Sequence, residues 1–95
     1  MRLNRYEVQA IVATFHEVFL RGSVSLFGSR TDDAKKGGDI DLFLEVPDKT
    51  DLFHKKIRFL ARLKKTIGDR KIDVVFDMDP ARLIEQEARR WAIPL

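Results

Sequence analysis

The sequence of 95 residues contains no cysteine, which excludes disulfide bonds and thiolate zinc sites and allows a reducing compartment. No apolar run approaches the length of about 18 residues that a membrane span needs. No signal peptide is recognisable either, so we expect a cytoplasmic protein without membrane contact. Internal repeats and low-complexity segments are absent as well.

A large excess of one charge is also missing, because the net charge is only +3 although the pI is about 9.4. Such a mild excess is compatible with an anionic partner and does not require one.

What is present indicates one small globular domain over residues 1–95, because 44% of the residues are hydrophobic and the length is near the lower limit for a single core. We predict an α/β (α+β) fold with a small mixed sheet of three to four strands flanked by about four helices. The connection between Gly28 and Asp39 is too short for a crossover helix, so the strands on either side of it are expected to be antiparallel neighbours. Strands are predicted at 24–27, 39–46 and 71–76, helices at 3–20, 51–67 and from Asp79-Pro80 onward, and one or two helical turns at 29–35, before a loop at 35–38.

Local signals add finer expectations about the helices. Gly22 and Gly68 are predicted to end the first two long helices, and Thr50 or Asp51 to cap the start of the second. The apolar tail 92–95 is expected to pack against the sheet or against a partner. The apolar stripe predicted for helix 51–67 is Phe53, Ile57, Leu60, Leu63 and Ile67, and the core positions predicted for the last helix are Leu83, Ile84, Ala88 and Trp91.

The second long helix also carries a basic face with two possible interpretations. It is either a solvated surface or a docking site for RNA or for an acidic partner. Aromatic residues do not alternate with the cations, and Phe53 and Phe59 are explained as core, so stacking on single-stranded RNA is not favoured. We therefore do not expect direct nucleic-acid binding. The residues of this face are Lys55, Lys56, Arg58, Arg62, Lys64 and Lys65.

The pattern that carries chemistry joins two strands. The first strand ends in Gly28-Ser29, where a glycine lets the backbone approach a ligand and a serine offers N–H and O–H donors to phosphate. The next strand begins with Asp39 and Asp41, which point to one face about 7 Å apart. Because two such carboxylates repel each other, a divalent cation between them relieves an electrostatic cost. Together these residues predict a nucleoside triphosphate bound with magnesium.

A third acid, Asp73, stands alone among apolar neighbours in the strand at 71–76. An unpaired carboxylate inside a buried strand is disfavoured, so we expect Asp73 to have a partner. One possibility is a salt bridge. The other, which the upstream acids favour, is that Asp73 is the third acid of the metal site.

This constellation resembles the minimal nucleotidyltransferases of the DNA polymerase β superfamily, which carry Gly-Ser, about ten residues, Asp-x-Asp on the next strand and a third acid on a later one. The resemblance implies transfer of a nucleoside monophosphate to a hydroxyl, with Mg²⁺ held by Asp39, Asp41 and Asp73. Asp73 would complete a second metal position or take the proton of the attacking hydroxyl. Gly28 and Ser29 would bind the outer phosphates. Arg30 would neutralise the leaving pyrophosphate, or else pair with Asp32 or Asp33.

A bare catalytic core of this length also resembles the antitoxin half of two-gene toxin–antitoxin systems. The resemblance then implies ATP as the donor and, as the acceptor, a tyrosine of a partner ribonuclease toxin of the HEPN class. Two alternatives remain open. The chain is a nucleotidyltransferase-like antitoxin that neutralises its toxin by docking without catalysis, or it is a core that acts on RNA or a small molecule with a separate subunit supplying the acceptor site.

Overall fold

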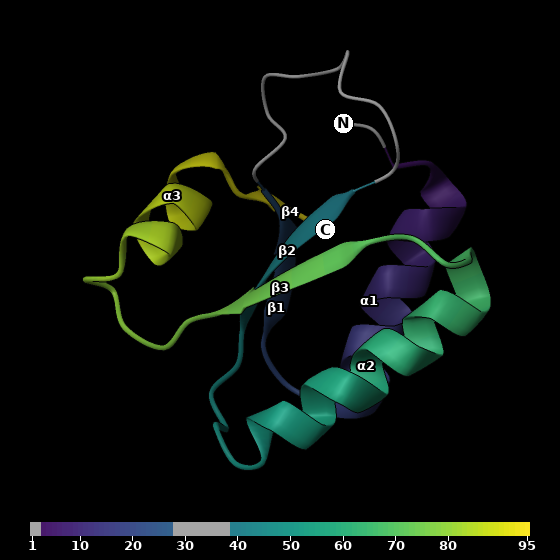
Figure 1. Ribbon diagram of the computed structural model, residues 1–95, viewed down its shortest axis with the longest axis horizontal. Coiled ribbons are helices and arrows are strands. Elements are labelled where there is room, and N and C mark those ends of the chain that lie inside the picture. The colour runs from purple at the N-terminus through teal and green to yellow at the C-terminus, as the bar shows by residue number, and fades with distance from the viewer. Residues whose placement is uncertain (1–2, 28–38) are drawn as a thin grey trace.

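The computed structural model describes residues 3–27 and 39–95 (Figure 1). These residues form three helices and four strands, which confirms the α+β class. The helical turns predicted at 29–35 and the loop predicted at 35–38 lie outside the described residues. None of the helices formed by residues 3–27 and 39–95 is both long and apolar enough to cross a membrane. The elements are α1 (Arg5–Phe19), β1 (Ser23–Leu26), β2 (Ile40–Glu45), α2 (Leu52–Ile67), β3 (Ile72–Phe76), α3 (Leu83–Trp91) and β4 (Ile93–Pro94).

The four strands form one mixed sheet in the order β3-β2-β1-β4. β1 and β2 are antiparallel neighbours, as the short connection between them predicted. β2 and β3 are parallel, and α2 makes the crossover between them. β4 pairs with β1 in antiparallel fashion, and the N–H of Leu95 donates to the carbonyl of Val24 at 3.0 Å. The apolar tail therefore packs on the sheet, which is one of the two positions predicted for it.

Helices cover both faces of the sheet: α1 and α2 lie together on one side and α3 lies on the other (Figure 1). The larger core fills the α1/α2 side and includes Phe15, Phe59 and the even-numbered residues Leu42 and Leu44 of β2. Phe43 points to the opposite face, where it packs with Phe27, Val75 and Ala88. β2 is thus buried on both faces, which agrees with its nearly continuous apolar sequence.

α1 has a start signal that was not predicted, and it ends at a different residue from the one predicted. The Asn4 side chain accepts the N–H of Glu7 at 2.8 Å while Glu7 accepts the N–H of Asn4 at 3.1 Å, a capping box that the sequence analysis missed. The helix ends at Leu20, whose φ is +70°, and not at Gly22. Gly22 instead lies against β2, where a Cβ would be 2.1 Å from the carbonyl oxygen of Glu45. A glycine is needed there for close approach, not for capping.

α2 buries a different side from the predicted apolar stripe. Phe59 and Leu63 are fully buried, whereas Phe53 and Ile57 remain 69% and 50% exposed. Two residues span about 200° of a helix, so burial of Phe59 turns Ile57 outward. Asp51 is the N-cap residue of α2, which is one of the two residues predicted. Its side chain makes no capping hydrogen bond, however, and its φ is +59°. The end of α2 at Gly68 is confirmed.

α3 starts later than predicted, at Leu83 and not at Asp79-Pro80. The Asp79 side chain accepts the N–H of Ala81 at 2.9 Å, so it caps a turn that precedes the helix. The predicted core positions Leu83 and Ile84 are exposed. The helix instead buries Ala88 and the carboxylate of Glu85, and Trp91 is half-buried. The prediction for α3 failed because it assigned only apolar residues to the core, whereas the charged residue Glu85 occupies a core position.

Candidate active site

Three strand ends meet at one edge of the sheet: the end of β1 and the beginnings of β2 and β3. The N–H of Phe27 donates to the carbonyl of Asp41 at 3.0 Å, and the N–H of Ile40 donates to the carbonyl of Lys71 at 2.9 Å. Phe27 directly precedes Gly28, so the backbone that leads into the predicted phosphate-binding turn is fixed beside Asp41. Gly28, Ser29 and Arg30 themselves lie outside the described residues.

Asp41 and Asp73 are register partners in the parallel pair of β2 and β3. Register partners on neighbouring strands lie about 4.8 Å apart and point to the same face of the sheet. Asp39 precedes Asp41 by two residues, so the alternation of the strand places it toward that face as well. Asp41 is half-buried, whereas Asp39 and Asp73 are exposed. The structure therefore brings a carboxylate from each of two strands together on one face of the sheet.

One expectation about Asp73 is wrong. The sequence predicted that Asp73 lies inside a buried strand. In the structure β3 is the edge strand of the sheet, and the Asp73 side chain is exposed. An exposed carboxylate has little desolvation cost, so no partner is needed to stabilise it. None of the ion pairs that join described side chains includes Asp73, which removes the structural support for the salt-bridge interpretation.

The face that carries the acids is bordered by α3. Phe43 is the next residue of β2 on this face after Asp41, and it packs against Ala88 of α3. The guanidinium of Arg89 lies 5.2 Å from the centre of the Phe43 ring and 3.3 Å from Glu45 Oε2. α3 thus covers the sheet up to the position beside Asp41, and the acidic end remains uncovered by the described helices.

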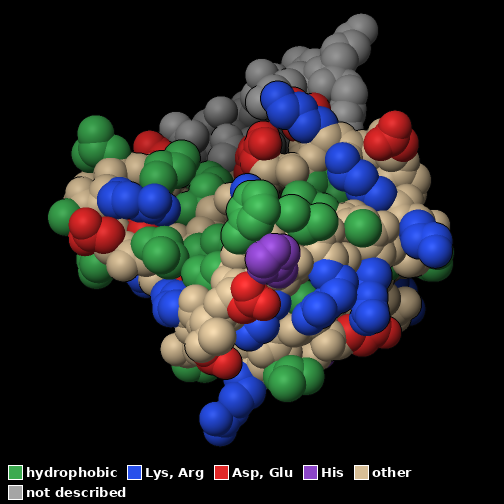
Figure 2. Space-filling view, turned by 60° about the horizontal axis from the view of Figure 1, so that its bottom comes forward, with side chains coloured by type: hydrophobic (Ala, Val, Ile, Leu, Met, Phe, Trp, Pro, Cys, Tyr) green, Lys and Arg blue, Asp and Glu red, His purple; other side chains and the backbone are tan. Residues whose placement is uncertain are grey.

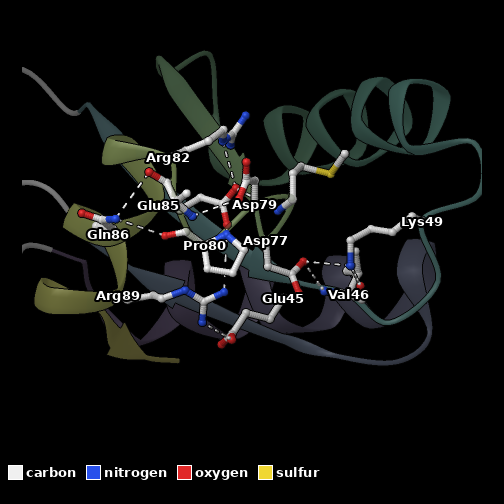
Figure 3. A network of polar contacts seen from close by, with 12 residues as sticks. Glu45, Val46, Lys49, Asp77, Asp79, Pro80, Arg82, Glu85, Gln86 and Arg89 are labelled. Carbon is white, nitrogen blue, oxygen red and sulfur yellow. Dashed lines mark hydrogen bonds and ion pairs between the residues drawn. The ribbon is translucent and has the colours of Figure 1, made fainter.

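A polar network holds α3 in this position at the far end of the strands (Figure 3). Glu85 Oε2 accepts the N–H groups of Met78 and Asp79 at 2.9 and 2.6 Å and lies 2.9 Å from Arg82 Nε. Asp77 Oδ1 accepts the N–H of Val46 at 3.1 Å and pairs with Lys49 Nζ. These carboxylates fix the turn between β3 and α3 to the end of β2.

The sequence analysis did not find Glu85. Its signal was the spacing of Arg82, Glu85 and Arg89, which places two cations three and four residues from one acid on a helix. That spacing is common on solvated helix faces, so it does not by itself identify a buried carboxylate.

The comparison with known families decides the class of this site. The family model described as nucleotidyltransferase domain matches residues 7–93. The chain belongs to this nucleotidyltransferase domain family. A comparison with curated proteins finds no match. The family match runs from the first turn of α1 to the first residue of β4, and the mixed sheet agrees with a polymerase β-like nucleotidyltransferase fold. Membership makes nucleotidyl transfer the class of activity and a nucleotide the substrate.

Nucleotidyltransferase domains commonly use a divalent metal, and the donor chemistry at the strand ends fits one. Carboxylate oxygens are the ligands that Mg²⁺ prefers, and Asp41 and Asp73 come from neighbouring strands in register. Within residues 3–27 and 39–95, however, no three His, Cys, Asp or Glu side chains gather as a metal-binding group. The strands thus supply carboxylate donors for a metal on one face of the sheet, but the described carboxylates do not surround a single metal position.

Proposed function

We propose that this nucleotidyltransferase domain, residues 1–95 acting as a single minimal domain, transfers AMP from ATP to a hydroxyl group in the presence of Mg²⁺. The observation that carries the proposal is the register of Asp41 opposite Asp73 at the strand ends where β1 leads into Gly28-Ser29. In a member of this family, acids on neighbouring strands beside a Gly-Ser turn suit a metal-bound triphosphate.

Each proposed residue has a separate role. Asp39 and Asp41 hold the magnesium that accompanies the triphosphate, and Asp73 completes a second metal position or takes the proton of the acceptor hydroxyl. When bound, magnesium neutralises phosphate charge and orients the triphosphate. Gly28 and Ser29 bind the outer phosphates, and Arg30 offsets the charge of the leaving group. The acceptor oxygen forms a bond to the α-phosphorus as the bond from that phosphorus to pyrophosphate breaks.

The acceptor that we propose is a tyrosine of a partner protein, a ribonuclease toxin of the HEPN class, for which this chain acts as the antitoxin. The resemblance to minimal nucleotidyltransferases supports this assignment. The exposed position of Asp73 on the edge strand also suits an acceptor as large as a protein, because the proposed base is accessible from the side of the sheet.

One observation favours a second candidate, in which the chain neutralises its partner by docking without catalysis. The described acids do not gather as a group of three, which suits a protein that does not hold a metal. Against it, a purely steric inhibitor has no physical need for acids at Asp39, Asp41 and Asp73.

The two candidates are separated by incubating the protein with Mg²⁺, labelled ATP and the product of the neighbouring gene. We expect Asp73→Asn to reduce label transfer at least about a hundredfold, while much of the ATP binding is retained. Replacing Asp39 and Asp41 together by Asn should abolish Mg²⁺-dependent nucleotide binding. Asp69→Asn, which removes a nearby exposed carboxylate, is the matched control and should retain transfer. Full neutralisation of toxicity by Asp73→Asn without transfer would establish docking as the function.

A further inference from the structure

The outer face of α2 carries an exposed apolar strip. Phe53, Ile57 and Ala61 recur every four residues, so they lie on one side of the helix. All three are exposed, although Phe53 and Ile57 are large apolar side chains. Single exposed apolar residues are ordinary on protein surfaces, but a row of them along one helix marks an interaction site more often. We call these three residues the α2 strip.

The surroundings of the α2 strip are strongly basic. Between Leu52 and Ile67, α2 contains six Lys and Arg residues and no Asp or Glu. Since the net charge of the whole chain is +3, the rest of the chain is net acidic. Only Lys55 and Arg62 of these six form ion pairs with described acids, with Asp48 at 3.7 Å and Glu17 at 3.3 Å. In the view of Figure 2, hydrophobic side chains lie next to a group of Lys and Arg side chains.

We propose that the outer face of α2 binds an acidic amphipathic helix of the acceptor protein. The apolar side of that helix would cover the α2 strip. Its acidic flank would face the cations of α2 that form no ion pair with a described acid, which are Lys56, Arg58, Lys64 and Lys65. The inference rests on the proposed function only in identifying the bound protein as the acceptor. It commits to a protein helix because a strip with four-residue spacing matches the apolar face of a second helix.

Two other anionic partners fit the strip less well. Single-stranded RNA binds through rows of aromatic platforms, and Phe53 is the one aromatic side chain among the three residues of the strip. An anionic membrane needs a helix whose whole apolar face is free to enter the lipid, whereas α2 buries Phe59 and Leu63 in the protein core.

The position of α2 links this surface to the proposed acceptor site. α2 ends at Gly68, and β3 begins four residues later at Ile72, immediately before Asp73. The C-terminal end of α2 and Asp73 therefore lie at the same end of the sheet. The large residues of the α2 strip lie in the N-terminal half of α2, and α2 covers the face of the sheet opposite to the acids. A partner helix seated on the strip would therefore run on past Lys64 and Lys65, and its hydroxyl group would reach Asp73 around the exposed edge strand β3.

The probe for this surface is a fluorescent synthetic peptide of about 20 residues, helical, with leucine on one face and glutamate on the other. Its anisotropy is measured against the full chain at low and high salt. We expect binding that weakens with salt, and a loss of about tenfold in affinity when Phe53 and Ile57 are both replaced by Ala. Leu83→Ala is the matched control, because Leu83 is 80% exposed on the opposite side of the sheet, and it should bind like the wild type.

Three results would overturn the inference: no binding of the acidic peptide, equal losses for Leu83→Ala and for the double variant, or tighter binding of oligouridine or of phosphatidylglycerol vesicles through Phe53 and Ile57. Thermal unfolding of each variant shows that it is folded. Asp41→Asn separates this inference from the proposed function, because it should retain peptide binding and lose transfer. Retained transfer in Asp41→Asn would contradict the proposed function and leave the docking result standing.

Discussion

Glu85 offers the sharpest test of how the fold is held together. The side chain is fully buried, and its Oε2 accepts two backbone N–H groups and contacts Arg82, while Oε1 lies 4.0 Å from Arg89. Truncation to Ala leaves the N–H groups of Met78 and Asp79 without an acceptor, at about 1–3 kcal/mol each. It also removes the counter-charge of two arginines. We therefore expect Glu85→Ala to lower the free energy of unfolding by about 3–5 kcal/mol.

Glu85→Gln separates the charge from the hydrogen bonds. The amide oxygen can still accept the two N–H groups, but the bonds lose their charge-assisted part, so the expected loss is about 1–3 kcal/mol. Glu87→Gln is the matched control on the exposed side of α3, where the carboxylate accepts from Trp91 at 2.8 Å, and should change stability by less than about 0.5 kcal/mol.

Chemical denaturation measures the three free energies, and amide hydrogen exchange locates the effect. Amide exchange at Met78 and Asp79, in the turn after β3, should accelerate in Glu85→Ala more than exchange in the sheet does. If Glu85→Gln proved as stable as the wild type, the expected contribution of the charge would be refuted. If Glu85→Ala were also as stable as the wild type, the assignment of Glu85 as a stabilising anchor would be refuted.

Two further predictions concern the turns. Gly22→Ala should destabilise the fold by at least about 1–3 kcal/mol, because the new Cβ would meet the carbonyl oxygen of Glu45 at 2.1 Å. Gly68 also has a positive φ, but a Cβ added there would meet no neighbouring atom. Thermal unfolding should therefore show a smaller loss of stability for Gly68→Ala than for Gly22→Ala, and equal losses would exclude the steric explanation. Hydrogen bonds from Thr50 lower the pKa of Asp48. The associated stabilisation is therefore present above the ordinary aspartate pKa, about 3.9, and is lost as pH falls through the lowered value. Carboxyl NMR titration should show that Thr50→Ala raises the pKa of Asp48; an unchanged value would contradict this cause.

The sequence predicted the elements well where periodicity and core agree. β2 and β3 were expected at 39–46 and 71–76, and they form at Ile40–Glu45 and Ile72–Phe76. The antiparallel neighbours β1 and β2 followed from the length of one connection. The errors occur where a helix has more apolar residues than the sheet can cover. α2 has apolar residues on two sides, and only the tertiary packing decides that Phe59 is buried and Phe53 is not.

The candidate site shows a similar division. The residue types and the alternation of Asp39 and Asp41 could be taken from the sequence. The exposure of Asp73 could not, because it depends on β3 being the edge strand. Strand order arises from long-range pairing, which local pattern does not reveal. Residues 28–30, which carry the other half of the motif, lie outside the described residues, so their proposed roles remain predictions.

The placement of Asp41 beside Asp73 follows from the packing of the core. Their neighbours Ile40 and Ile72 are also register partners, and they are only 1% and 7% exposed. A slip of one residue between β2 and β3 would move Ile72 out of the core, and the same slip would send Asp73 to the other face of the sheet. Burying the isoleucines therefore puts both acids on one face.

A slip of two residues would keep the faces but separate the acids, and a contact at the far end of β3 opposes it. The ring of Phe76 lies 5.8 Å from that of Phe19 in α1, and its Cα is paired with that of Leu44. Moving β3 by two residues, about 6.6 Å along the strand, would pull Phe76 away from both neighbours. The aromatic contact between α1 and β3 thus fixes which acid faces which at the opposite end of the sheet. For this reason, substitutions at Phe19 or Phe76 should disturb the proposed metal site although neither residue lies in it.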